Sequence, residues 1–144
     1  MGNGVTDPPR ALLLTEGLSL WGGMDPATGE LIDAHHPQRG ATLTGRAVVM
    51  PSGRGSSSSA SVLAESVRAG TAPAAIILGE PDLILAIGAA VAEELYGVRI
   101  RVVVLPPSQL GAIVDGAPVD LDSIGEPIAN GPSGPRAGGG DGGA

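Results

Sequence analysis

Cysteine, lysine and phenylalanine are absent from this sequence of 144 residues, and Trp21 and Tyr96 are its only aromatic side chains. Without cysteine, the chain can form neither a disulfide framework nor a thiolate metal site. Without phenylalanine, a hydrophobic core has to be built from Ala, Val, Leu and Ile, which favours helices packed closely on a sheet. The hydrophobic content of 42% is enough for one domain with a modest core.

Positive charge is also scarce in the sequence. The eight cationic residues are all Arg and are scattered, and 15 acidic residues give a net charge of −7. Binding of nucleic acid by phosphate neutralisation is therefore not expected. The N-terminus lacks the basic flank and apolar stretch of a signal peptide, and no apolar run reaches about 18 residues without a charge. We expect a soluble cytoplasmic protein that does not bind membranes.

The two ends of the sequence differ in composition from its centre. Residues 124–144 are dominated by Gly and Pro, a composition that buries too little apolar surface to offset the entropy of ordering. We therefore predict a disordered tail over 124–144, a flexible N-terminus over 1–10, and one folded domain over 11–123.

The pattern within the domain predicts an α/β fold. Short β-branched runs bounded by Gly and Pro are typical of buried strands, and the segments between them have helical spacing and end at glycines. The order is β-α-β-α-β, for which parallel pairing is expected. The predicted strands are 46–50, 74–78 and 99–105, and the predicted helices are about 57–69 and 82–96.

The segments that flank this central unit are expected to add strands at both ends. Residues 12–23 and the loop that follows them precede the unit, and residues 111–122 follow it. Both segments contain short apolar runs separated by glycine.

The stretch PSGRGSSSSASVLAESVRAG, residues 51–70, places four serines between the first predicted strand and its helix. Ligands bind at this position in open α/β sheets. Gly53 and Gly55 permit close backbone approach, and the free amides of the helix and a Ser cap favour an anion. Arg54 can bind a carboxylate or phosphate through two hydrogen bonds. The alternative is a plain turn with an N-cap. The stretch matches neither the phosphate-binding loop pattern nor the nucleophile elbow.

A second unusual stretch, SLWGGMDPATGELIDAHHPQRG, covers residues 19–40. It contains the only Trp and both histidines, His35 and His36. Solvated surface turns are one interpretation of it. The histidines with aspartate suggest a metal site, but a third ligand at a defined spacing is missing, so no metal is expected in this chain.

Five motifs stand at spaced positions between residues 17 and 105. They are Trp21-Gly22-Gly23-x-Asp25-Pro26-x-Thr28-Gly29, Ile32-Asp33-x-x-His36-Pro37, Gly53-Arg54-Gly55-Ser56-Ser57, Ala72-Pro73-Ala74-Ala75-Ile76 and Glu80-Pro81-Asp82. Together they resemble the small, swivelling subunit of aconitase X. This resemblance implies a swivelling β/β/α domain that closes over a larger subunit, which holds the substrate and an iron or iron-sulfur centre. It also implies dehydration of a small hydroxy acid, chiefly cis-3-hydroxy-L-proline or, in archaeal members, mevalonate 5-phosphate.

The resemblance also implies site residues. Dehydration needs a base at the carbon next to the carboxylate and a Lewis acid at the departing hydroxyl. Since the aconitase family uses a Ser in a similar turn as its base, Ser56 is the predicted base and Ser57 the second choice. A helix N-terminus and Arg54 would favour a Ser alkoxide in a dry site. The predicted substrate-binding residues are Arg54, Gly55, Ser58, Asp33, His36, Trp21, Gly22 and Gly23; the serines after Ser57 cap the helix or contact the substrate.

Other functions remain open at this stage. A phosphohistidine swivel domain has a similar fold, but its His precedes a helix, and here the comparable segments contain no His. A non-catalytic assembly module that accepts an anion at the serines is another alternative. Between the two substrates, cis-3-hydroxy-L-proline is favoured, because the four-serine run departs from the Gly-Ser-Thr-Val-Gly-Ser pattern of the archaeal phosphomevalonate members.

Overall fold

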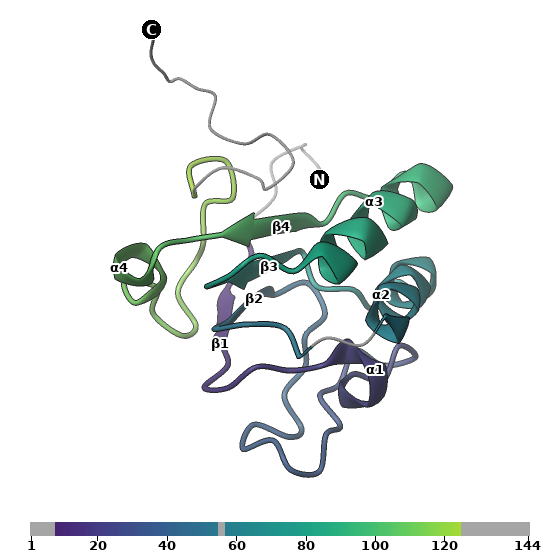
Figure 1. Cartoon of the computed structure of the whole chain (residues 1–144), viewed down its shortest axis with the longest axis horizontal. Helices are drawn as coiled ribbons and strands as arrows, with labels where there is room; N and C mark the ends of the chain where they lie inside the picture. The colour runs from purple at the N-terminus through teal and green to yellow at the C-terminus, as the bar shows by residue number, and fades with distance from the viewer. Residues whose placement is uncertain (1–7, 55–56, 125–144) are drawn as a thin grey trace, which may run out of the picture.

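A parallel four-stranded sheet forms the centre of the computed structural model, which describes residues 8–54 and 57–124. Its strands lie side by side in chain order (Figure 1). The last three strands lie within the runs predicted from the sequence, and the first is the expected additional strand before them. The strands are β1 (Ala11–Leu13), β2 (Ala47–Met50), β3 (Ala75–Leu78) and β4 (Arg101–Val104).

The register of the sheet separates two apolar cores. Every residue of β2 and β3 is buried, because parallel strands of this kind are covered on both faces. Alternate rows point to opposite faces: the row that contains Val48 and Ile76 belongs to one core, and the row that contains Val49 and Ile77 belongs to the other.

Two long helices cover the first face. Helices α2 (Ser58–Ala69) and α3 (Leu83–Tyr96) lie side by side there (Figure 1). Both end at glycines with positive φ, Gly70 and Gly97, as the sequence predicted. Asp82 is the N-cap of α3, and its carboxylate accepts a hydrogen bond from Leu85 N at 3.0 Å. No helix in the described part of the chain is both long and apolar enough to cross a membrane.

The second face is covered by the C-terminal part of the described chain. It comprises the short helix α4 (Pro107–Leu110) and the segment that follows, which contributes Val119, Leu121 and Ile124 to the second core. The strand expected over 111–122 does not form, so this prediction was wrong. A single antiparallel bridge joins Arg10 to Pro118 instead, made by Ala11 N donating to Ala117 O and Val119 N donating to Pro9 O. Turns on both sides of the bridge, the first at Gly116 with φ +81°, end the pairing.

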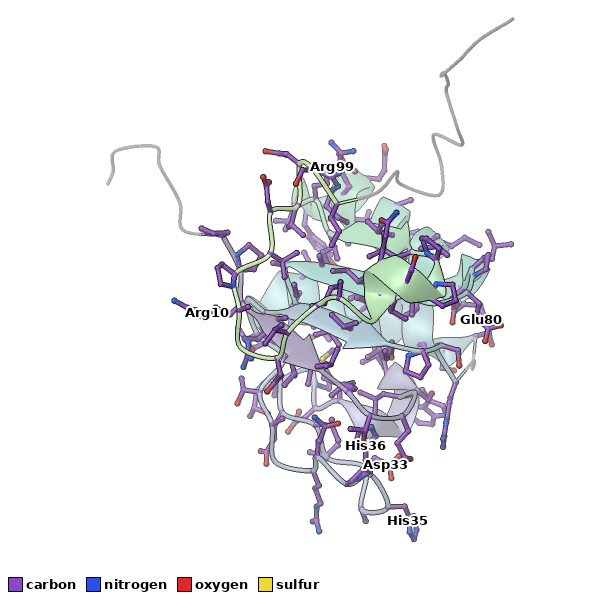
Figure 2. The ribbon with its side chains drawn as sticks, turned by 90° about the vertical axis from the view of Figure 1, so that its left-hand side faces the viewer. Arg10, Asp33, His35, His36, Glu80 and Arg99 are labelled. Carbon is purple, nitrogen blue, oxygen red and sulfur yellow. The ribbon has the colours of Figure 1, made fainter. Side chains whose placement is uncertain are left out.

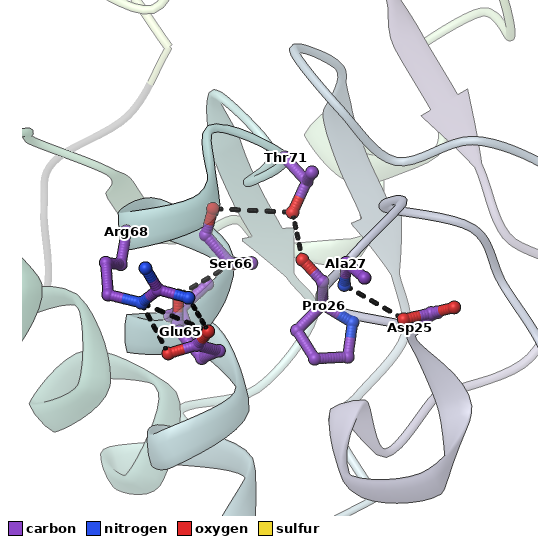
Figure 3. Close-up of polar contacts among 8 residues, drawn as sticks. Asp25, Pro26, Ala27, Glu65, Ser66, Arg68 and Thr71 are labelled. Atoms are coloured by element: carbon purple, nitrogen blue, oxygen red, sulfur yellow. Dashed lines mark hydrogen bonds and ion pairs between the residues drawn. The ribbon is translucent and has the colours of Figure 1, made fainter.

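The chain from β1 to β2 is mostly turns rather than further strands. It contains the short α1 (Leu20–Gly23) and isolated bridges. The turn at Asp25 docks on the C-terminal end of α2, where the Thr71 hydroxyl donates to Pro26 O at 2.7 Å (Figure 3). On the same turn of α2, an exposed Arg68 binds Glu65; these hydrogen bonds lower the pKa of Glu65 and raise the pKa of Arg68.

Candidate functional site

The candidate site lies at the carboxyl edge of the sheet. Since all four strands are parallel, the loops that follow them meet at this edge. We call residues 14–19, 51–57 and 79–82 the first, second and third edge loops. The second edge loop leads from β2 into α2 and carries the Gly-Arg-Gly-Ser sequence. Gly55 and Ser56 lie outside the described residues.

The three edge loops are packed backbone to backbone. Leu18 and Gly53 form a parallel bridge, and Gly79 N donates to Pro51 O at 3.0 Å. A Cβ added to Gly17 would lie 2.4 Å from Ser52 O, and one added to Gly53 would lie 2.2 Å from a carboxylate oxygen of Asp82. At Gly17 the contact is with backbone, so only glycine permits the approach, whereas at Gly53 a larger residue would have to displace the Asp82 carboxylate. Residues 51–53 of the second edge loop are therefore held between the other two loops.

The described serines differ in environment. Ser57 is the exposed N-cap residue of α2, and its side chain makes no capping hydrogen bond. Ser58 is exposed at the first helical position. Ser59 is buried, and its hydroxyl binds residues of α1 and the first edge loop rather than the helix end. Of the two roles predicted for Ser59, capping of the helix is therefore wrong, and contact with the substrate stays a prediction.

Trp21 lies next to the start of α2. Its backbone N–H donates a hydrogen bond to the Ser59 hydroxyl at 3.3 Å, and its backbone carbonyl accepts one from the Ser19 hydroxyl at 3.2 Å. The side chain is nevertheless 60% exposed. Gly22, with φ +79°, and the buried Gly23 complete the turn. An aromatic side chain that is fixed at its backbone and open to solvent is suited to contact a ligand or partner.

Arg54 forms an ion pair with Glu16 of the first edge loop. Its Nη2 lies 3.5 Å from the Glu16 carboxylate, and both side chains are largely exposed. Exposed pairs of this kind contribute little to stability, so a ligand carboxylate can replace Glu16 at modest cost. Sequence reasoning identified Arg54 but missed Glu16, because a single Glu in a loop carries no distinguishing signal.

His36 is buried beneath the first edge loop. Its Nδ1 accepts a hydrogen bond from Gln38 N at 3.0 Å, so Nε2 carries the proton and donates to Glu16 O at 3.2 Å. The alternative interpretation of His36 as a solvated loop residue is therefore wrong. Both ring nitrogens are used inside the chain, and His36 fixes the backbone of the residue that pairs with Arg54.

Asp33 and His35 belong to the same loop as His36, but neither residue is buried. The Asp33 carboxylate accepts from His35 N at 2.9 Å and thereby shapes the turn. His35 is exposed and points away from the body of the molecule, whereas His36 lies closer to it (Figure 2). The solvated interpretation is confirmed for His35.

The donor atoms of this chain do not fit an iron-sulfur centre. Such centres are held mainly by cysteine thiolates, and the sequence has no cysteine. Across residues 8–54 and 57–124, no three His, Asp or Glu side chains gather as a metal site. A cluster would therefore need ligands from outside this sequence.

Comparison with protein families identifies the domain. A family model described as the aconitase X swivel domain matches residues 8–129. The chain belongs to the aconitase X swivel-domain family. The resemblance inferred from the spaced motifs is thus confirmed, as is the mixed α/β swivel fold.

Several curated relatives of this swivel domain are dehydratases by name. The chain is 59% identical over 81 residues to a cis-3-hydroxy-L-proline dehydratase of Pseudomonas aeruginosa, covering 56% of this chain and 14% of that protein. It is 45% identical to a phosphomevalonate dehydratase small subunit of Methanopyrus kandleri, covering 58% of this chain and 64% of that one. The chain thus spans less than two thirds of the length of either relative.

Solved structures agree with the fold. The crystal structure of Thermococcus kodakaraensis aconitase X in its holo form superposes with a TM-score of 0.63 at 29% identity, covering 75% of this chain and 76% of that chain. The solution structure of a UPF0107 protein gives a TM-score of 0.64 at 32% identity, covering 76% and 79%.

Proposed function

We propose that this chain is the small subunit of an aconitase X-type hydro-lyase that dehydrates a small hydroxy acid. The observation that carries the proposal is the 59% identity over 81 residues to a cis-3-hydroxy-L-proline dehydratase. The enzyme would be active only as a heterodimer with a larger subunit. That subunit would hold the iron or iron-sulfur centre, because this chain has no cysteine.

Ser56 is the proposed general base. Its neighbours in the described chain support this assignment: Arg54 precedes it, and α2, a helix of 12 residues, begins at Ser58. Positive potential from the guanidinium and the helix N-terminus would favour a Ser alkoxide once the partner excludes water. The alkoxide would take the proton from the carbon next to the substrate carboxylate as the hydroxyl on the adjacent carbon leaves as hydroxide; return of that proton from Ser56 would then give water and restore the alkoxide. Ser57 is the second choice.

Arg54 is the proposed anchor for the substrate carboxylate. Its only ion-pair partner in the described part of the chain is Glu16, and that pair is open to solvent. The amide of Gly55 and the hydroxyl of Ser58 would add contacts on the same side. Trp21, Gly22 and Gly23 would form the wall of the closed site.

Asp33 and His36 take a supporting place in this proposal. Asp33 shapes the loop and His36 holds Glu16 O, so both act on the geometry around Arg54. Contact between Asp33 and substrate would require closure on the partner.

The proposed substrate is cis-3-hydroxy-L-proline. The identity to dehydratases of that name reaches 59%, whereas two phosphomevalonate dehydratase small subunits are 45% and 37% identical. Mevalonate 5-phosphate is the second candidate, because the second of these relatives matches this chain over 82% of its own sequence.

Reconstitution tests the proposed function. The chain would be purified alone and after co-expression with the larger aconitase X subunit of its source, and each preparation assayed with both hydroxy acids. We expect no turnover by the isolated chain and dehydration of cis-3-hydroxy-L-proline by the complex. If the complex dehydrated mevalonate 5-phosphate but not cis-3-hydroxy-L-proline, mevalonate 5-phosphate would become the assigned substrate. A stable complex that dehydrates neither acid would favour a non-catalytic anion-binding or assembly module.

A further inference from the structure

Helix α3 carries an exposed apolar stripe along one side. Leu83, Ile87, Val91 and Leu95 follow one another at intervals of four residues, and their exposed fractions are 71%, 49%, 42% and 62%. Side chains at this spacing lie on one face of a helix, here over roughly 18 Å of its length. We call these four residues the α3 stripe.

The stripe is not the face that α3 uses within the domain. Leu85, Gly88, Ala89 and Ala92 are the buried residues of α3 and pack toward the sheet and α2. The four residues of the stripe therefore lie outside both apolar cores of the domain. A contiguous exposed apolar surface of this kind is typical of a protein-protein contact.

The stripe begins beside the candidate site. Leu83 follows Asp82, whose carboxylate packs against Gly53 at the start of the Gly-Arg-Gly-Ser sequence. The stripe therefore starts where the third edge loop ends, so one partner surface can cover both.

The charges around the stripe oppose pairing with a second copy of this chain. Residues 80–98 include four acidic side chains and no basic one. Glu80 and Asp82 stand at the start of α3, and Glu93 and Glu94 at its end. An antiparallel α3 pair would bring these two acidic ends together, and a parallel pair would place each acidic end beside its copy. Like charges across an interface are unfavourable.

We propose that the α3 stripe is a docking surface for the larger subunit, which presents an apolar groove with Arg or Lys at its rim. This inference rests on the proposed function, because it takes the larger subunit as the occupant. The stripe extends the interface from the chemical site along the whole of α3. Domain and partner are thereby held together at a surface distinct from the residues that contact substrate.

Glutamate substitutions on the stripe test this inference. Ile87→Glu and Leu95→Glu would be measured for binding to the purified larger subunit by calorimetry, with Val114→Glu as control. Val114 is 66% exposed and precedes the bridge on the opposite face of the sheet, so it matches the change in charge and polarity. We expect each stripe variant to bind with a Kd at least about tenfold higher than the wild-type chain. The Tm of the isolated stripe variants should be unchanged. Val114→Glu should bind with wild-type affinity.

Three outcomes would contradict the expectation in different ways. Wild-type affinity of both stripe variants overturns the docking surface and leaves the proposed function intact. If the isolated wild-type chain is a dimer and the Ile87→Glu variant is a monomer, a second copy of the chain occupies the stripe, and the choice of the larger subunit as occupant is overturned. Failure of the wild-type chain to bind the larger subunit at all overturns the proposed function itself.

Discussion

The backbone N–H of Trp21 donates a hydrogen bond to the buried hydroxyl of Ser59, across 3.3 Å. This contact joins α1 to the first turn of α2, so the exposed indole and the serines are held at a fixed separation. Replacement of the hydroxyl tests whether the contact carries that function.

Ser59→Ala should destabilise the isolated chain by about 1 kcal/mol, because Trp21 N would lose its acceptor in a partly buried position. Since Trp21 is the only Trp, its fluorescence anisotropy should fall as the turn loosens. Urea unfolding and anisotropy would be compared with Ser61→Ala, an exposed serine of the same helix. Equal anisotropy in both variants would show that other contacts hold the turn.

His36→Ala should cost about 2–3 kcal/mol of stability, since it removes two hydrogen bonds in a buried position and leaves Gln38 N without an acceptor. His35→Ala is the matched control and should change stability by less than about 0.5 kcal/mol, because its side chain is exposed. The measurement is urea unfolding of the isolated chain. Similar losses in the two variants would contradict the structural role assigned to His36.

Arg54→Lys in the assembled enzyme should raise KM about tenfold with little change in kcat, because lysine keeps the charge but loses the planar two-point grip on a carboxylate. Arg99→Lys, at an exposed residue just before β4, should leave both constants unchanged. An unaltered KM in Arg54→Lys would mean that the guanidinium contributes only charge.

Ser56→Ala in the assembled enzyme should lower kcat at least about 10²-fold, the lower range for a positioned acid-base group, with nearly unchanged folding and substrate affinity. Ser58→Ala should cost far less. The decisive measurement is exchange of the substrate α-hydrogen with solvent deuterium. Normal exchange in Ser56→Ala would remove this residue from the mechanism, and normal exchange in Ser57→Ala as well would exclude both serines as the source of the base.

The central fold could be predicted from sequence because its local signals agree with its tertiary environment. The β-branched runs around Val48 and Ile76 are buried on both faces, and Gly70 and Gly97 end their helices as expected. The segment around Pro118 misled the prediction, since its alternating apolar residues cover the sheet without forming a ladder. Apolar spacing predicts burial there, but the backbone pairing is limited to one bridge and does not make a strand.

The candidate site could be predicted only in part, for a similar reason. Arg54 and the serines stood out because they follow a buried strand. The environment of His36 could not be predicted in this way, since its ring binds Gln38 N and the carbonyl of Glu16, which lies 20 residues away in the chain. Asp82 belongs to one of the motifs that resemble the family, but its packing against Gly53 is a tertiary contact that no local pattern encodes.

The backbone packing of the three edge loops limits how this domain can be re-engineered. Gly17 lies against Ser52, and Gly53 lies against Asp82, so a transplanted second loop would meet neighbours shaped for a different backbone. Loop grafting aimed at a new hydroxy acid would therefore have to exchange residues 14–19, 51–57 and 79–82 as one cassette. Libraries that vary one loop at a time would mostly sample misfolded site geometries.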